Sequence, residues 1–122
     1  MIKVGVDLVE IKRIEKSLRN KRFLKNIFST KEYEELKTRN FKAQSVAANF
    51  CAKEAFLKSI GKGLGYIKLN KIELLRNSSG EPYLKINDDK FSSMSDRKIN
   101  FSVSITHTKE YALATVIADF GD

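Results

Sequence analysis

The sequence contains few of the residues that cross-link, rigidify or anchor a polypeptide. Among its 122 residues there is one cysteine, one proline and no tryptophan. The single cysteine, Cys51, excludes an internal disulfide and favours a reducing, cytoplasmic setting. The apolar runs are far shorter than the roughly 20 residues of a membrane-spanning helix. Charged residues interrupt the first of these runs, so we expect neither a membrane span nor a signal peptide. The length predicts one domain, residues 1–122.

Acidic residues are scarce in the first half of the chain. Residues 1–62 hold 15 lysines and arginines against 7 acidic residues, a net charge of +8, whereas residues 63–122 hold 8 of each. Residues 12–25 are the most basic stretch, because seven cations stand there beside a single acid, Glu15. Such a stretch attracts nucleic acid, an anionic membrane or an acidic protein. A solvated helix face is an equally good interpretation of the same charges.

The first half reads as one strand followed by helices. Residues 2–6 (IKVGV) are typical of a short strand that ends at Asp7. A helix is predicted over residues 8–19, where apolar side chains recur at helical spacing: Leu8, Ile11, Ile14 and Leu18. The run Ser-Thr-Lys-Glu that begins at Ser29 is a capping-box pattern, which predicts a helix over residues 30–39.

The second half is rich in strand patterns. Residues 70–76 and 82–87 are predicted strands joined by the turn-like run NSSGE, and residues 88–98 are predicted to form a loop or short helix. Residues 100–108 alternate apolar and polar side chains, and residues 111–120 follow as the second strand of a hairpin. One strand, several helices and then several strands indicate an α+β fold with an antiparallel sheet in its second half.

A helix predicted over residues 43–60 carries two charges on a surface that is apolar almost all round. Glu54 and Lys58 stand one turn apart there, and we expect both side chains to be part-buried. The ordinary interpretation is a helical ion pair, which contributes only ~0.2–0.5 kcal/mol. A part-buried carboxylate needs stronger compensation, and a metal ion is one such compensation.

Asp7 is the second acid of interest, because it directly follows the first predicted strand. It suits the N-cap of the helix predicted after it. It also suits a hard cation, because magnesium takes one or two protein carboxylates and completes its shell with phosphates and water. Asp7 and Glu54 form such a pair if the fold brings them together.

Residues 61–65 (GKGLG) end the helix that carries Glu54. On their own they are a helix stop followed by a turn. The glycines Gly61, Gly63 and Gly65 also allow the backbone to approach a phosphate, and Lys62 adds a positive charge. The spacing matches neither a P-loop nor a dinucleotide-binding motif.

The chain has a single histidine, His107, at the end of the alternating strand. A lone histidine there is more often structural or exposed, but it can donate to a phosphate or move a proton near neutral pH. Cys51 is best interpreted as a small buried apolar residue.

Taken in order, four segments resemble one family. The segments are GVDLVEIKRIE, FCAKEAFLKSIGKGLG, SSGEPYL and FSVSITHTKEYALATVIA, and they span nearly the whole chain. They resemble the holo-(acyl carrier protein) synthases, the small bacterial type of 4′-phosphopantetheinyl transferase. The resemblance implies transfer of 4′-phosphopantetheine from coenzyme A to a serine of apo-acyl carrier protein, in support of fatty acid biosynthesis. It also implies dependence on Mg²⁺, and a homotrimer with coenzyme A in clefts between subunits.

The resemblance assigns roles to the candidate residues. It makes Asp7 and Glu54 the metal ligands and places Lys58 near the reacting phosphates. The proton of the serine then goes either to Glu54 directly or to a water on the metal that Glu54 orients. It places the glycine loop near the nucleotide and His107 near the coenzyme A phosphates. The basic stretch resembles the docking helix for the acidic carrier protein, through Arg13, Lys16, Arg19 and Arg22.

The sequence departs from the family pattern at two positions. Asn49 precedes Phe50 where many members have arginine, so a basic contact at that position cannot be carried over. The family's Gly-Thr-Gly loop is Gly61-Lys62-Gly63 here, so a threonine hydroxyl is replaced by a lysine.

Two other interpretations compete with the enzyme. A nucleic-acid-binding module would use the same lysines and arginines, but it would give Asp7 and Glu54 no task, and most phenylalanines look like core residues. A non-catalytic scaffold of the same family would not need Asp7, Glu54 and Lys58 intact. We therefore expect coenzyme A and an acidic carrier protein as partners, rather than nucleic acid or a membrane.

Overall fold

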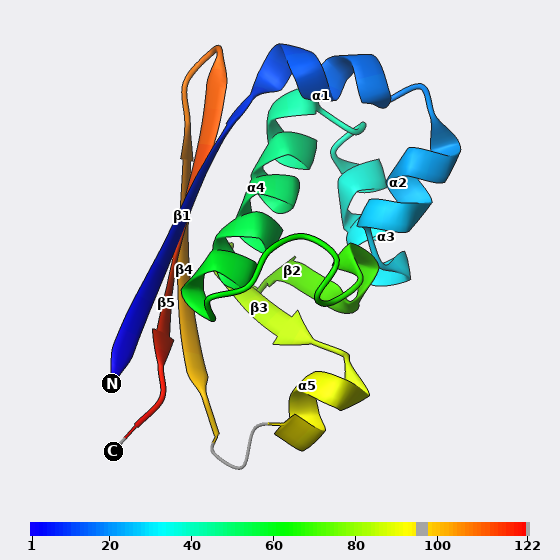
Figure 1. The fold of residues 1–122 in the computed structure, drawn as a ribbon. Coiled ribbons are helices and arrows are strands. Elements are labelled where there is room, and N and C mark those ends of the chain that lie inside the picture. The colour runs from blue at the N-terminus through cyan, green and yellow to red at the C-terminus, as the bar shows by residue number, and fades with distance from the viewer. Residues whose placement is uncertain (95–97, 122) are drawn as a thin grey trace.

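A long central helix connects the two sheets of this chain, as the computed structural model shows for residues 1–94 and 98–121. Strands β1 (Ile2–Glu10), β5 (Tyr111–Asp119) and β4 (Asn100–His107) form an antiparallel sheet in that order. Helix α4 (Ala43–Ser59) packs across its inner face, and helices α1 to α3 cover the far side of α4 (Figure 1). The two ends of the described chain lie side by side, because the Phe120 amide donates to the Met1 carbonyl (3.0 Å).

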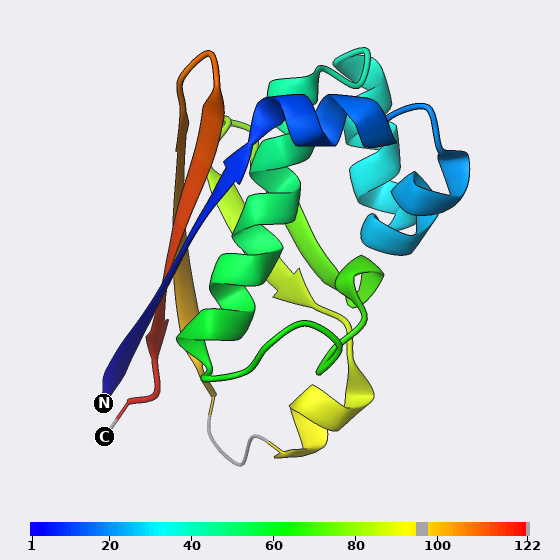
Figure 2. The ribbon, with the colours of Figure 1, turned by 45° about the horizontal axis from the view of Figure 1, so that its top comes forward.

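The remaining elements close the far side of the core. Helices α1 (Ile11–Ser17), α2 (Lys21–Ile27) and α3 (Thr30–Thr38) follow β1. After α4 come a short 3-10 helix, η1 (Leu69–Lys71), the hairpin strands β2 (Ile72–Arg76) and β3 (Pro82–Ile86), and helix α5 (Asp89–Met94). Figure 2 shows β2 and β3 behind α4, on the side away from β1. No helix in the described part of the chain has the length and apolar character needed to cross a bilayer.

Most of the predicted elements are confirmed within one or two residues. The capping box at Ser29 is present, since its hydroxyl accepts from the Glu32 amide while the Glu32 side chain accepts from the Ser29 amide. The predicted hairpin is formed by β4 and β5, and the α+β fold class is confirmed. Helix α5 occupies residues 89–94 of the stretch predicted as a loop or short helix, whose residues 95–97 lie outside the described chain.

The prediction for the first strand is wrong in its length. β1 continues past Asp7 to Glu10, and Leu8 lies on this strand rather than in a helix. The cause is long-range pairing, because every residue of β1 has a partner on β5, from Ile2 opposite Asp119 to Glu10 opposite Tyr111. Asp7 is therefore not a helix N-cap; that position belongs to Glu10.

The basic stretch also forms two helices where one was predicted. α1 ends at Ser17 and α2 starts at Lys21. Asn20 caps α2, because its side-chain oxygen accepts from the Phe23 amide (3.2 Å). The break lets Ile14 and Leu24 both reach the core.

Glycine at position 5 allows α4 to lie directly on β1. A Cβ atom added there would stand 2.0 Å from the Ala55 carbonyl oxygen and 2.5 Å from the Ser59 amide nitrogen. Both distances are impossible for a real side chain, so only glycine permits this approach. β5 presents small residues to the same helix, including Ala112 and Ala114, which are fully buried.

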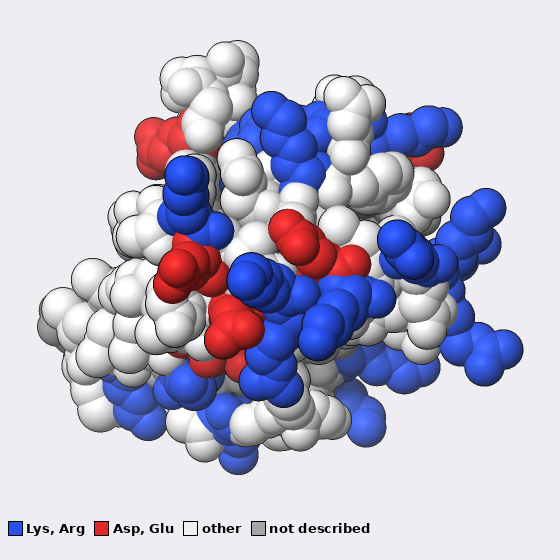
Figure 3. Space-filling model, turned by 90° about the horizontal axis from the view of Figure 1, so that it is seen from above, with Lys and Arg blue, Asp and Glu red and all other residues white. Residues whose placement is uncertain are grey.

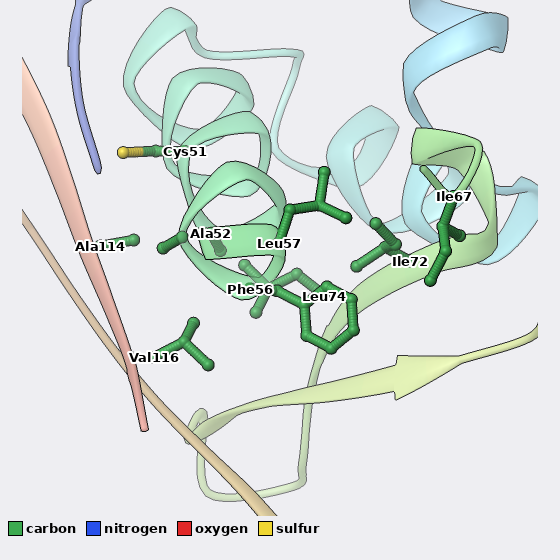
Figure 4. Packing of buried hydrophobic residues seen from close by; sticks show 10 residues of the cluster. Cys51, Ala52, Phe56, Leu57, Ile67, Ile72, Leu74, Ala114 and Val116 are labelled. Carbon is green, nitrogen blue, oxygen red and sulfur yellow. The ribbon is translucent and has the colours of Figure 1, made fainter. Parts of the chain in front are cut away.

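The main core joins α4 to both sheets. Phe56 and Leu57 of α4 are fully buried against Ile72 and Leu74 of β2, and Val116 of β5 closes the cluster on the other side (Figure 4). Helix α4 is apolar almost all round because it is covered on nearly every side. This packing fixes the positions of the buried polar side chains of α4, which are Asn49, Lys53 and Ser59.

A buried ion pair links α4 to α3. Lys53 and Glu32 are fully buried, and the Lys53 ammonium lies 2.5 Å from the Glu32 carboxylate, 2.6 Å from the Ile27 carbonyl oxygen and 2.8 Å from that of Leu69. Burial lowers the pKa of Lys53 to about 8 and raises that of Glu32, with each charge opposing the shift of the other. The amide of Asn49 also donates to Glu32 (3.2 Å), so the residue that departs from the family pattern belongs to this network.

No described residue covers the outer face of the three-stranded sheet along β1. Its side chains on β1 are apolar and 52–68% exposed: Ile2, Val4, Val6 and Leu8. Ile117 extends this apolar face onto β5, opposite Val4. A contiguous apolar sheet face of this kind marks an interaction site more often than a surface left in water.

Candidate active site

Asp7 points inward from the middle of β1, towards α4. It stands opposite Ala114 of β5 and is 8% exposed. The Lys58 ammonium, from the last turn of α4, donates to the Asp7 carboxylate (3.0 Å) and to the Val6 carbonyl oxygen (3.1 Å). The strand and the helix therefore present a carboxylate and an ammonium group to each other.

Glu54 completes a group of three charges with Asp7 and Lys58. Burial, the charge of Asp7 and a hydrogen bond between the two carboxyl groups together raise the pKa of Glu54 to about 7, and Lys58 opposes the shift. This interaction requires Asp7 and Glu54 to lie close together, and their joint role as metal ligands stays a prediction. A cation placed between them would relieve their repulsion.

Lys58 is more exposed than predicted. Its side chain is 54% exposed, because the last turn of α4 leaves the stem in solvent while the ammonium reaches Asp7. The hydrogen bond to Asp7 and the charge of Asp7 raise the pKa of Lys58, so it stays protonated at neutral pH. An exposed ammonium beside two acids is available to a phosphorylated ligand.

The buried side chain of Cys51 on α4 contacts Asp7. Its thiol donates to the Asp7 carbonyl oxygen (2.9 Å) and lies 3.5 Å from the carboxylate. Burial and the charge of Asp7 raise the thiol pKa to about 12, so it remains a donor. Cys51 is buried as predicted, but its contact with Asp7 was missed. The signal was its position one turn before Glu54 on the same helix face.

The donor set fits magnesium better than a transition metal. The described residues contain no group of three or more histidine, cysteine, aspartate or glutamate side chains placed to hold an ion. The site instead offers two carboxylates, Asp7 and Glu54, and burial together with the charge of Asp7 raises the pKa of Glu54. Magnesium typically takes one or two carboxylates and leaves its other positions to phosphates and water.

The glycine loop leaves α4 one turn beyond Lys58. Gly61 and Gly65 have φ angles of +73° and +93°, and the Lys62 amide donates to the Leu57 carbonyl (2.8 Å), which is the predicted helix stop. The Lys62 ammonium lies 4.8 Å from the ring centre of Tyr66. All five residues of the loop are exposed, and its contact with a phosphate remains a prediction.

His107 lies apart from these three charges. It is exposed at the end of β4 and lines a cavity of about 620 Å³ with Arg39, Lys42 and Arg76. The residues lining this cavity include neither Asp7 nor Glu54 nor Lys58. The three cations were missed in the sequence. The available signal was the SSGEPYL segment, since Gly80 and Pro82 line the same cavity.

A basic surface covers α1, α2 and the turn between them. Arg13 and Lys16 on α1, Arg19 in the turn and Arg22 on α2 are all exposed. Figure 3, which views the molecule from this end, shows lysine and arginine side chains over much of the surface with fewer acidic side chains among them. These cations lie in solvent on two helices, and together they form one positively charged surface that can attract an acidic partner.

Comparison with known proteins gives a consistent result over nearly the whole chain. The family model of the 4′-phosphopantetheinyl transferase superfamily matches residues 3–116. The chain is 37% identical over 120 residues to a holo-[acyl-carrier-protein] synthase of Clostridium beijerinckii, with 98% of each chain covered. It is 34% identical over 119 residues to one of Fusobacterium nucleatum, covering 96% of this chain and 98% of the relative.

Solved structures agree with the sequence relatives. A holo-(acyl-carrier-protein) synthase from Bacillus anthracis in complex with CoA (3′,5′-ADP) superimposes with a TM-score of 0.81 at 30% identity, covering 98% of this chain and 96% of that one. A holo-[acyl-carrier-protein] synthase from Helicobacter pylori in complex with coenzyme A gives 0.82 at 30% identity, covering 95% and 99%.

Proposed function

Because the chain belongs to the 4′-phosphopantetheinyl transferase superfamily and is an enzyme of the holo-(acyl carrier protein) synthase type, we propose that it moves 4′-phosphopantetheine from coenzyme A to a serine of apo-acyl carrier protein. Adenosine 3′,5′-bisphosphate is the second product. The ion pair of Lys58 with Asp7 (3.0 Å), beside Glu54 on the same helix, is the single observation on which we base the reacting centre.

In this proposal Asp7 and Glu54 hold Mg²⁺ and Lys58 holds the pyrophosphate. The serine oxygen forms a bond to the β-phosphorus, and the bond from that phosphorus to the oxygen of the α-phosphate breaks. Negative charge grows on the departing phosphate, and the exposed Lys58 ammonium stabilises it electrostatically. Magnesium, held by Asp7 and Glu54, would neutralise part of the charge of the pyrophosphate.

Glu54 is the candidate for taking the proton of the serine. Without a metal ion the pKa of Glu54 is raised to about 7, and the charge of bound magnesium would lower it, which keeps Glu54 ionised and able to accept a proton. It accepts the proton directly or through a water that it orients. Cys51 has the role of holding Asp7 in place through the thiol hydrogen bonds, since its own pKa of about 12 excludes it as a base.

We assign the cavity around His107 to the nucleotide end of coenzyme A, with the glycine loop and Lys62 close to its phosphates. Three cations beside His107 suit a phosphate group. This cavity and the Asp7 centre are separate in one chain, which fits a substrate that bridges two subunits. The exposed apolar sheet face offers a surface for that association, and we propose a homotrimer built through it.

The basic surface on α1 and α2 is the proposed docking site for the acidic carrier protein, through Arg13, Lys16, Arg19 and Arg22. We place the reaction in the cytoplasm, in support of fatty acid biosynthesis. The one free cysteine, Cys51, is in keeping with a reducing compartment.

A single assay tests the reaction. The protein is incubated with apo-acyl carrier protein, coenzyme A and magnesium, and the carrier protein is weighed by mass spectrometry. We expect a gain of one phosphopantetheine group, lost with a chelator and in Glu54→Gln. The matched control is Glu34→Gln, since Glu34 is exposed on α3 and should tolerate the same change.

Two outcomes would overturn the proposal. Full transfer by Glu54→Gln would remove the reacting centre as assigned. An absence of transfer to any carrier protein, together with salt-sensitive binding of DNA or RNA, would favour the nucleic-acid-binding alternative for the basic surface.

A further inference from the structure

A second basic concavity lies away from the proposed reacting centre. It has a volume of about 810 Å³ and lies between the end of α2, the start of α3, η1 and the hairpin of β2 and β3. The residues that line it do not include Asp7, Glu54, Lys58 or His107. The proposed transfer reaction therefore gives this cavity no task.

Four lysines from different elements converge on this cavity. They are Lys25 of α2, Lys31 of α3, Lys71 of η1 and Lys85 of β3. All four are exposed, and none forms an ion pair with another described residue. Like charges gathered in one concavity repel each other and focus a positive potential into it, which attracts an anion.

One carboxylate lines the cavity, and it is already engaged. Glu73 is 4% exposed, and its oxygens accept from the Ser29 hydroxyl (2.5 Å) and from the Asn87 amide. With four lysines against one glutamate, the lining carries a formal charge of +3. The buried glutamate therefore leaves most of the positive charge of the lysines uncompensated.

The neutral groups of the cavity indicate what else the ligand carries. The side-chain oxygen of Asn70 is buried and has no hydrogen-bond partner among the described residues. This oxygen has almost no surface open to a ligand, but the exposed side chains of Thr30 and Asn87 also line the cavity and can accept from a hydroxyl or an N–H group. Phe28 and Tyr33 add aromatic surface to the lining. The volume lies in the range of small-molecule sites.

We propose that this cavity binds a small phosphorylated molecule that also carries hydroxyl or N–H groups, the chemistry shared by nucleotides and sugar phosphates. The lysines hold the phosphate groups, and the side chains of Thr30 and Asn87 accept from the rest of the ligand. A concave site with aromatic walls favours such a molecule over an extended acidic chain. The proposal is independent of the transfer reaction.

The test is an amide-resolved NMR titration at low salt with two probes. Uridine diphosphate carries phosphates with a sugar and a base, and inorganic pyrophosphate carries the charge alone. We expect uridine diphosphate to shift the amides of Thr30, Lys31 and Lys71 at lower concentration than pyrophosphate does. The double variant Lys71→Ala/Lys85→Ala should weaken its binding at these amides by about tenfold or more, because charge-assisted hydrogen bonds are lost.

The matched control is Lys37→Ala/Lys68→Ala, which removes two exposed lysines that line neither cavity. It should weaken binding by less than about twofold, because distant surface charges are screened. Phosphopantetheine transfer should be unchanged in both double variants, so failure of this proposal is distinguishable from failure of the proposed function. Three results would overturn the inference: no shifts at millimolar probe, equal weakening by the control, or shifts at the same amides caused by the acidic carrier protein instead.

Discussion

Replacing Lys53 by methionine should destabilise the fold by about 3–5 kcal/mol, the usual cost of removing one partner of a buried ion pair. Methionine fills much of the same volume but donates no hydrogen bond. It leaves the buried Glu32 carboxylate without its countercharge, and the carbonyl oxygens of Ile27 and Leu69 without their donor. The native stability of a domain is itself only about 5–15 kcal/mol, so the loss is large.

The expected fall in melting temperature follows from the chain length. With 122 residues and an unfolding entropy of roughly 2.1 cal/mol/K per residue, each kcal/mol shifts the melting temperature by about 4 °C. The variant should therefore melt roughly 12–20 °C lower. Urea unfolding at matched protein concentration gives the free energy directly, and the matching removes any effect of assembly on the comparison.

A double-mutant cycle with Glu32→Gln tests the reasoning behind that number. The two single losses should exceed the loss in the double variant, because removing the second partner removes a charge that the first change left uncompensated. Lys37→Met, on the exposed face of α3, should change stability by less than about 0.5 kcal/mol. A loss below about 1 kcal/mol for Lys53→Met, or strict additivity in the cycle, would refute the ion pair as a structural link.

The remaining predictions concern the site and its partners. The pKa of Glu54 rises from 4.5 to about 7 on folding, so the metal-free protein should lose stability as pH climbs between these values, and magnesium should raise the melting temperature more above pH 7 than below it. Calorimetry checks this, and persistence of the pH dependence in Glu54→Gln would contradict it. Glu54→Gln and His107→Ala should each lose transfer activity, and mixing the two variants should restore part of it if subunits share the site; no recovery after co-refolding argues against sharing. Reversing charge with Arg13→Glu and Arg22→Glu should slow association with the carrier protein more at low salt than at high salt, as stopped-flow measurements can test. An equal effect at both salt concentrations would exclude steering by the basic surface.

Local signals in the sequence were sufficient for several elements of the fold. The capping box at Ser29 and the unbroken apolar surface of α4 gave two helices, because both signals act within a few residues. Alternation in residues 100–107 gave β4 for the same reason. What local patterns could not give was β1 beyond Asp7, since its length is set by pairing with β5 more than a hundred positions later in the chain.

The candidate site likewise has one part that local patterns predict and one part that depends on long-range packing. That Glu54 and Lys58 share a strip of α4 follows from helical spacing, whereas their contact with Asp7 depends on the packing of α4 on β1 over Gly5. The ion pair of Lys53 could not be predicted, because the capping box already accounted for its partner, Glu32. When one residue makes both a local and a long-range contact, a sequence pattern reveals only the local contact.

The two ends of the described chain lie side by side and offer an engineering route. The Met1 amine and the Gly121 carbonyl oxygen are 2.9 Å apart, so a short linker could join them without bending the sheet. New ends could then be opened in the exposed turn at residues 77–80, between β2 and β3. Such a circular permutant would place β5 directly before β1 in the chain, and faster refolding than the parent would show that the long-range β1–β5 pairing limits the folding rate.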